Sequence, residues 1–235
     1  MKKNIPNILT SCNLISGCIA TCYAFVGGAE MALLWIVIGA AFDFFDGMSA
    51  RLLGVSSPIG KELDSLADDI TFGLAPSMMI FFQLNVMDYP PFLEPLRPVL
   101  PYTAFVMAAF SALRLAKFNL DERQTLGFIG LPTPANALFW GSLVVGYQPL
   151  LESSPMMTIA VLCLVIISSW MLVCEIPMFA LKFKHWGMDY PGNKLKYAFI
   201  AGSALAIILF HIAALAPIII VYIVLSAATQ QKKAE

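Results

Sequence analysis

The sequence predicts an all-α fold: a polytopic membrane bundle of about eight transmembrane helices with both termini in the cytoplasm. Apolar residues make up 59% of the 235 residues, and charged residues only 12%, about half the share in ordinary globular chains. The apolar residues come in runs of about twenty, the length that crosses a bilayer. The third observation is that the basic residues fall almost entirely into alternate polar patches between these runs.

Each run is expected to form one helix of a single domain covering residues 1–235. The first run follows Lys2 and Lys3 and is interrupted by Thr10 and Asn13, so we expect a retained span rather than a cleaved signal peptide. The stretch between Lys196 and Lys232 is far too long for one crossing and must turn back as a hairpin. The expected spans are 7–27, 30–53, 59–83, 99–118, 133–149, 155–178, 194–211 and 213–230.

The distribution of charge predicts how this bundle is oriented. With eight spans, both termini and the loops after the second, fourth and sixth helices share one side. Every basic residue except Arg97 then lies on that side, which the positive-inside rule assigns to the cytoplasm. These residues are Lys2, Lys3, Arg51, Lys61, Arg114, Lys117, Arg123, Lys182, Lys184, Lys194, Lys196, Lys232 and Lys233. A net charge of −1 also excludes a nucleic-acid partner, which would require a basic surface.

Five aspartates interrupt the apolar runs where a membrane helix should avoid charge: Asp43, Asp46, Asp64, Asp68 and Asp69. A carboxylate at the centre of such a helix costs about 2.5–3.5 kcal/mol, so five of them indicate a functional site. Asp43 and Asp46 are spaced i,i+3, and Asp64 and Asp68 are spaced i,i+4, so each pair projects from one helix face. The second helix ends and the third begins on the cytoplasmic side, so the two pairs can meet beneath that surface.

Four oxygen ligands without histidine or thiolate suit one or two Mg²⁺ or Mn²⁺ ions. Such a centre can hold a pyrophosphate and neutralise the charge that develops in phosphoryl transfer. Gly47 and Gly60 allow a phosphate or nucleotide to approach the backbone closely. Arg51 supplies a planar guanidinium that matches phosphate oxygens.

The residues Asp43-x2-Asp46-Gly47-x2-Ala50-Arg51-x8-Gly60-x3-Asp64-x3-Asp68 resemble the full signature of the CDP-alcohol phosphotransferase family. The resemblance extends through Pro6-Asn7-x2-Thr10-x2-Asn13 to much of the chain. Within the family, the chain is most similar to membrane-integral phosphatidylserine synthases. That similarity rests on the segments 62–68, 72–76, 114–119 and 130–135.

The resemblance implies a reaction between CDP-diacylglycerol and L-serine at the cytoplasmic face of the cell membrane, in a homodimer. It implies that Asp43, Asp46, Asp64 and Asp68 bind metal and that Asp68 is also the general base. It implies that Gly47 and Arg51 contact the CDP group. By position, Ser57 and the start of the first helix, with Asn7 and Thr10, are further candidates for nucleotide contact, although a turn serine and a helix start are equally compatible.

Two basic residues, Arg114 and Lys117, are spaced i,i+3 at the cytoplasmic end of the fourth helix and can face one ligand. They are candidates to bind the serine carboxylate, or they anchor the topology. A different acceptor (glycerol phosphate, inositol phosphate or choline) stays an alternative, as does a cation-coupled transporter. A transporter, however, typically places its carboxylates at the midplane, within repeated halves.

Overall fold

The computed structural model describes residues 4–55, 57–121, 128–178 and 193–234. Nearly all of them are helical, and the expected all-α class is confirmed. The first half of the bundle comprises α1 (Ile5–Phe25), α2 (Ala29–Leu53), α3 (Pro58–Asp68), a π-helical segment (Asp69–Leu74), α4 (Ala75–Val86) and α5 (Phe105–Leu120). Short 3₁₀ turns at Glu94–Leu96 and Leu100–Ala104 connect α4 to α5. The second half comprises α6 (Thr133–Gly146), α7 (Gln148–Leu151), α8 (Met156–Val173), α9 (Asn193–Phe210), a 3₁₀ turn (His211–Ala214) and α10 (Leu215–Ala234).

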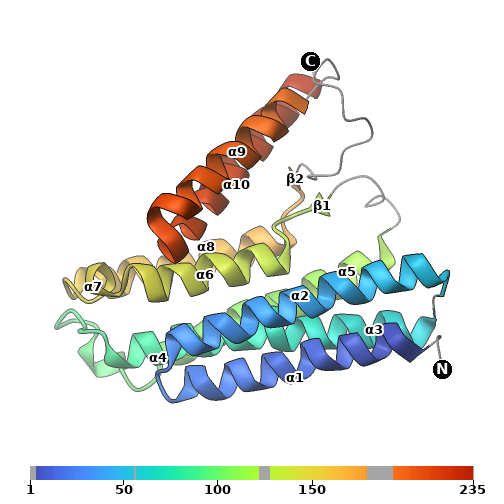
Figure 1. Ribbon diagram of the computed structural model, residues 1–235. Helices are drawn as coiled ribbons and strands as arrows, with labels where there is room; N and C mark the ends of the chain where they lie inside the picture. The colour runs from blue at the N-terminus through green and yellow to red at the C-terminus, as the bar shows by residue number, and fades with distance from the viewer. Residues whose placement is uncertain (1–3, 56, 122–127, 179–192, 235) are drawn as a thin grey trace.

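The helices lie side by side and alternate in direction (Figure 1). The helices α1 to α5 form one layer, α6 and α8 lie above it, and the α9–α10 pair crosses the top at an incline. The start of α1 and the junction between α2 and α3 lie at the same end of the bundle as the C-terminal ends of α5 and α8. The eight crossings and the cytoplasmic position of both termini stay predictions. Several of the basic residues used to orient the bundle, Lys2, Lys3, Arg123, Lys182 and Lys184, lie outside the described residues.

The helix ends next to the aspartates follow from local sequence. Pro58 occupies the first turn of α3, where no backbone N–H is needed, and Ser57 caps this turn by accepting a hydrogen bond from the Gly60 N–H at 3.0 Å. The α2 helix ends at Gly54, whose φ of 62° is the left-handed conformation that glycine adopts without strain. These two ends hold α2 and α3 in a tight connection that brings their aspartates together.

The apolar core forms two clusters on either side of α4 and α6. Ile36, Phe72 and Met79 are fully or almost fully buried between α1, α2 and α4. Trp140 and Val165 belong to the second cluster, between α4, α6, α8 and α10. The indole N–H of Trp140 donates to the Ser168 hydroxyl at 3.0 Å, which satisfies its polar edge within the core.

Some of the expected helix bounds are wrong. The helix expected at 155–178 ends at Val173, because Cys174 is extended (φ −66°, ψ 155°) and Pro177–Met178 form the strand β2. This strand pairs antiparallel with β1 (Phe128–Ile129), a pairing that hydropathy alone does not predict. The helix expected at 133–149 ends at Gly146, and the one expected at 99–118 begins as a 3₁₀ turn.

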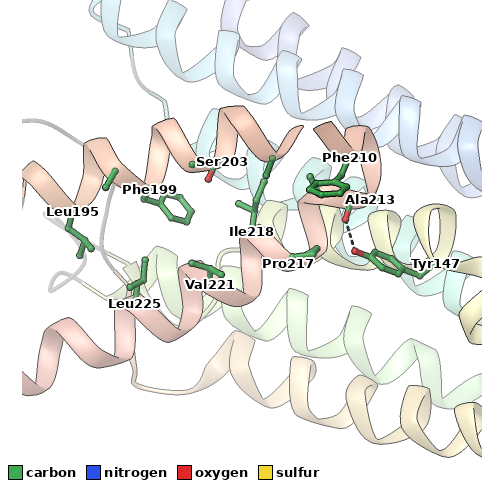
Figure 2. A pocket seen from close by; sticks show the side chains of 14 residues that line it. Tyr147, Leu195, Phe199, Ser203, Phe210, Ala213, Pro217, Ile218, Val221 and Leu225 are labelled. Carbon is green, nitrogen blue, oxygen red and sulfur yellow. Dashed lines mark hydrogen bonds between the residues drawn. The ribbon is translucent and has the colours of Figure 1, made fainter. Parts of the chain in front are cut away.

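The hairpin expected in the last apolar stretch is present. His211 has a φ of 51° between α9 and α10, which ends the first limb, and Figure 1 shows the two helices side by side. The turn is fixed to α6, because the Ser142 hydroxyl donates to the Ile212 carbonyl at 2.7 Å and the Tyr147 hydroxyl donates to the Ala213 carbonyl at 3.0 Å. The second of these bonds is drawn in Figure 2, beside an apolar cavity of about 570 Å³ between α9 and α10.

Four helical stretches of the described chain are long and apolar enough to cross a membrane: α1, α2, α8 and the stretch Asn193–Thr229 that contains the hairpin. The segments α3–α4, α5 and α6 lie beside them in the same bundle (Figure 1). The molecule is therefore an all-α membrane protein.

Candidate metal and phosphate site

Three of the predicted aspartates meet where α2 packs beside α3. One carboxylate oxygen of each of Asp43, Asp64 and Asp68 lies within 4.8 Å of the other two. Asp43 comes from α2 and the other two come from successive turns of α3, which is the convergence that the i,i+4 spacing predicts.

Asp46 lies next to this cluster but is held differently. It is only 6% exposed, and its Oδ2 atom accepts a hydrogen bond of 2.6 Å from the Thr10 hydroxyl of α1. Its carboxylate is close enough to Asp64 and Asp68 to interact with them electrostatically. The four predicted ligands thus belong to one acidic centre, with Thr10 orienting the fourth.

The donor set fits a hard divalent cation. Burial and mutual repulsion both disfavour negative charge on carboxylates packed this closely, so a cation is the natural compensation. The Oδ1 atom of Asp64 is buried and has no hydrogen-bond partner among the described residues. A buried carboxylate oxygen without a donor is suited to metal ligation, and an all-oxygen site matches Mg²⁺ or Mn²⁺ rather than a softer metal.

A cavity of about 500 Å³ opens directly beside the acidic centre. Its walls come from the start of α1, the end of α2, and the α2–α3 connection with the start of α3. It is large enough for part of a nucleotide. Seven of the predicted site residues lie on its surface: Asn7, Thr10, Asp46, Gly47, Ser57, Gly60 and Asp64.

The two predicted glycines keep this region open. A Cβ atom at Gly60 would lie 3.0 Å from both the Asn7 Oδ1 and the Ser57 Oγ atoms, so a side chain there would crowd α1 and the cap of α3. At Gly47 the nearest atom to such a Cβ would be Nη1 of Arg51, at 3.5 Å. The exposed Arg51 guanidinium therefore lies beside Gly47, which lines the cavity, whereas Arg51 itself is not a lining residue.

The two predicted acceptor ligands on α5 have different environments. Arg114 is 7% exposed, its Nη1 atom donates to the Thr133 hydroxyl at 3.4 Å, and its guanidinium lies 5.5 Å from the centre of the Phe118 ring. Asp68 and Tyr222 are close enough to interact with it electrostatically. Lys117, three residues further on, is exposed. The structure therefore brings Arg114, but not Lys117, into the buried region beside the acidic centre.

Asp69, which the sequence left without a role, is not part of the three-carboxylate cluster. It begins the π-helical segment, and its Oδ1 atom lies against Gly73, where an added Cβ would be 2.7 Å away. The Ser111 hydroxyl of α5 would be 2.8 Å from the same Cβ. Asp69 therefore faces the α5 side of the helix, as its 100° offset from Asp68 requires.

Sequence reasoning missed three residues around the acidic centre. Asn13 donates from Nδ2 to the Asp68 Oδ1 atom at 3.0 Å, and Thr133 and Tyr222 neighbour Arg114. Two of them carried a signal: Asn13 closes the N-terminal motif inside the first apolar run, and Thr133 lies in the segment 130–135 that resembles the family. Tyr222 lies beside Arg114 through helix packing, which no local pattern reveals.

Comparison with known proteins agrees with this geometry. The family model described as CDP-alcohol phosphatidyltransferase matches residues 3–181, which include every residue of the acidic centre and its cavity. The chain belongs to this family. The α9–α10 hairpin lies beyond the matched region.

Curated relatives share one printed name, CDP-diacylglycerol–serine O-phosphatidyltransferase. The Bacillus subtilis protein is 38% identical over 148 residues, which cover 63% of this chain and 78% of the relative. The Methanocaldococcus jannaschii protein is 33% identical over 151 residues, covering 63% and 62%. The Helicobacter pylori protein (strain 26695) is 33% identical over 135 residues, covering 57% and 54%. The alignment with the last of these spans only about half of the relative's length.

Proposed function

We propose that this protein transfers the phosphatidyl group of CDP-diacylglycerol to the hydroxyl of L-serine, producing phosphatidylserine and CMP. The observation that carries the proposal is the acidic centre, in which Asp43, Asp64 and Asp68 cluster, beside a cavity large enough for part of a nucleotide. Membership in the family and the shared name of the relatives support the same reaction. We further propose that the whole chain acts as one domain in a homodimer in the cell membrane, with this centre facing the cytoplasm.

Asp43, Asp46, Asp64 and Asp68 would hold one or two Mg²⁺ or Mn²⁺ ions. When bound, such an ion supplies Lewis-acid stabilisation to pyrophosphate oxygens. The pyrophosphate would lie between the acidic centre and Arg51, with the cytidine in the cavity lined by Asn7, Thr10, Ser57 and Gly60. The apolar surface of the bundle lets the diacylglycerol chains stay in the bilayer.

In the proposed reaction, the serine hydroxyl attacks the phosphorus that carries diacylglycerol, and the bond to CMP breaks. Asp68 accepts the hydroxyl proton, a contribution that is typically 10²- to 10⁴-fold in rate. The Asn13 amide already binds the Oδ1 atom of Asp68, which leaves Oδ2 for this role. The scheme needs no covalent enzyme intermediate.

The serine itself would bind on the α5 side of Asp68. Arg114 is buried there and can pair with the serine carboxylate through its planar guanidinium. Lys117 is a weaker candidate because its side chain is exposed.

The decisive experiment offers labelled CDP-diacylglycerol to the purified protein together with serine, glycerol 3-phosphate, inositol phosphate or choline. We expect phosphatidylserine and CMP with serine alone, loss of activity in EDTA, and recovery with Mg²⁺ or Mn²⁺. Asp43→Asn and Asp64→Asn should abolish turnover because each removes a charged ligand. If a product forms with another acceptor, that acceptor replaces serine in the proposal. If no acceptor leads to release of CMP, the transferase function is contradicted.

A further inference from the structure

A buried polar strip runs along one face of α1 and contacts the acidic centre. Thr10, Asn13 and Gly17 follow the spacing i,i+3 and i,i+4, so they lie one above another on the same face. Thr10 contacts Asp46, Asn13 contacts Asp68, and Gly17 lies against Thr71 of the π-helical segment. The α1 helix supplies no charged ligand, yet it contacts two of the four acidic residues.

Asn13 is completely buried, and its amide donates to Oδ1 of Asp68 at 3.0 Å. A carboxylate that is bound through one oxygen has lost rotation about its last side-chain bond, so the direction of its second oxygen is fixed. Hydrogen bonds to charged groups are stronger than those between neutral groups. Asn13 therefore orients the Asp68 carboxylate.

The backbone of Asn13 makes a second, independent contact with the same helix. Its carbonyl oxygen accepts a hydrogen bond of 3.0 Å from the hydroxyl of Thr71, three residues after Asp68. Thr71 is completely buried and fits between two glycines: an added Cβ at Gly17 would lie 2.8 Å from the Thr71 Cα, and one at Gly39 would lie 2.6 Å from the Thr71 Cγ2. These contacts fix the π-helical turn directly after Asp68, a type of turn frequent at functional sites.

We propose that Asn13 is a positioning residue, which holds Asp68 within the acidic centre through its side chain and holds the following π-helical turn through its backbone carbonyl. This inference rests on the proposed function, in which Asp68 binds metal and accepts the serine proton. It extends the site to α1 and assigns Asn13 a role that acts through Asp68, without contact with either substrate.

The test replaces Asn13 by leucine, which has a similar shape and no donor, and by aspartate, which has the same shape but an acceptor facing Asp68. Mn²⁺ binding to each purified variant is followed by electron paramagnetic resonance, which gives both the number of sites and their affinity. For Asn13→Leu we expect an unchanged number of sites, Mn²⁺ affinity about 10-fold weaker, and kcat per site lower by about 10- to 100-fold. The serine KM should stay within about threefold, and Asn13→Asp should be at least as impaired.

Ser16→Ala is the matched control. Ser16 is buried on the same helix one turn further on, and its hydroxyl donates only to the Cys12 carbonyl at 2.8 Å. We expect this variant to keep the affinity and the kcat of the wild-type protein. Equal losses in Ser16→Ala and Asn13→Leu would show that any change in α1 disturbs the bundle, which would overturn the inference.

Two other results would also overturn it. One is an Asn13→Leu variant with wild-type kcat and Mn²⁺ affinity. The other is a variant that has lost sites while the remaining sites keep full affinity and turnover, because this pattern indicates a purely structural role. If instead Asp43→Asn is fully active, the proposed function has failed, and that outcome is read separately from the Asn13 variants.

Discussion

The carboxyl group of Asp68 accepts a hydrogen bond from an amide on α1 and lies beside two further carboxylates, and Arg114 is close enough to interact with it electrostatically. As the proposed general base, it acts mainly in the transition state. We therefore expect the Asp68→Asn variant to keep most of its affinity for CDP-diacylglycerol while its turnover rate falls strongly. Binding of the labelled nucleotide lipid and single-turnover rates measure the two effects. More than about a tenth of the wild-type rate would exclude Asp68 as the base, because at least about 10²-fold is expected.

We propose that the choice of serine as acceptor depends on Arg114. A charge-assisted hydrogen bond contributes about 1.5–3 kcal/mol, so Arg114→Ala should raise the serine KM by about 10- to 100-fold. The KM for CDP-diacylglycerol should change little, since we propose that Arg51 and the acidic centre hold that substrate. Steady-state kinetics on membranes with verified protein content provide the measurement, and Lys117→Ala provides the comparison on the exposed side of α5. An unchanged serine KM in folded Arg114→Ala would leave Arg114 as a topology anchor.

Much of this site could be predicted at the scale of the residue. The helical spacing of Asp43, Asp64 and Asp68 determines which face each occupies, so their convergence followed from the sequence. The hydrogen-bond partners of these carboxylates could not be predicted in this way. Asn13 and Asp68 are far apart in the chain, and their contact depends on how α1 packs against α3, which spacing within one helix does not encode.

At the scale of the element, we expect the packing of the π-helical segment to require two glycines, Gly17 and Gly39, which leave room for Thr71. Gly17→Ala and Gly39→Ala should each lower the thermal midpoint, because overpacking a buried contact typically costs about 1–3 kcal/mol. Adding Thr71→Ser removes Cγ2, the atom nearest the new Cβ at Gly39. It should therefore recover part of the stability lost in Gly39→Ala, but little of that lost in Gly17→Ala, where the Thr71 backbone itself is in the way.

The control for this series is Gly202→Ala on α9, where an added Cβ has no neighbour within 4 Å. Alanine is the better helix former, so we expect no loss of stability there. Thermal unfolding in detergent is the measurement for all variants. Equal losses at Gly17, Gly39 and Gly202 would show that glycine flexibility, rather than the fit of Thr71, is what matters.

Hydropathy located the helices but not their irregularities. The helix expected at 155–178 contains Pro177, which has no backbone N–H to donate to the carbonyl of Val173 and whose ring would clash with that carbonyl. Proline chemistry, rather than hydropathy, therefore accounts for the end of α8 at Val173. Gly130, with φ of 76°, packs against this end, where a Cβ would be 2.6 Å from the Leu172 carbonyl oxygen. Hydropathy also gave no sign of the π-helical turn, in which Thr71 packs against Gly17 and Gly39.

At the scale of the whole molecule, the basic residues gather at the same end of the bundle as the candidate site. The cavity and the start of α3 lie at the end of the bundle that carries nearly all the basic residues in the described chain, and the loop around Arg97 lies at the opposite end (Figure 1). From the positive-inside rule we therefore expect the acidic centre at the cytoplasmic surface. In that position it would reach a water-soluble acceptor while the lipid substrate stays in the bilayer.

Cysteine labelling in intact cells tests this orientation. Ile59, at the start of α3, is 75% exposed, and Phe92, in the loop before Arg97, is 67% exposed. With a membrane-impermeant maleimide, Phe92→Cys should be labelled in intact cells, whereas Ile59→Cys should be labelled only after the membrane is permeabilised. The native chain is the background control, because its cysteines lie within apolar helices or at their ends. Labelling of Ile59→Cys but not Phe92→Cys in intact cells would invert the topology, and the acidic centre would then face away from the cytoplasm.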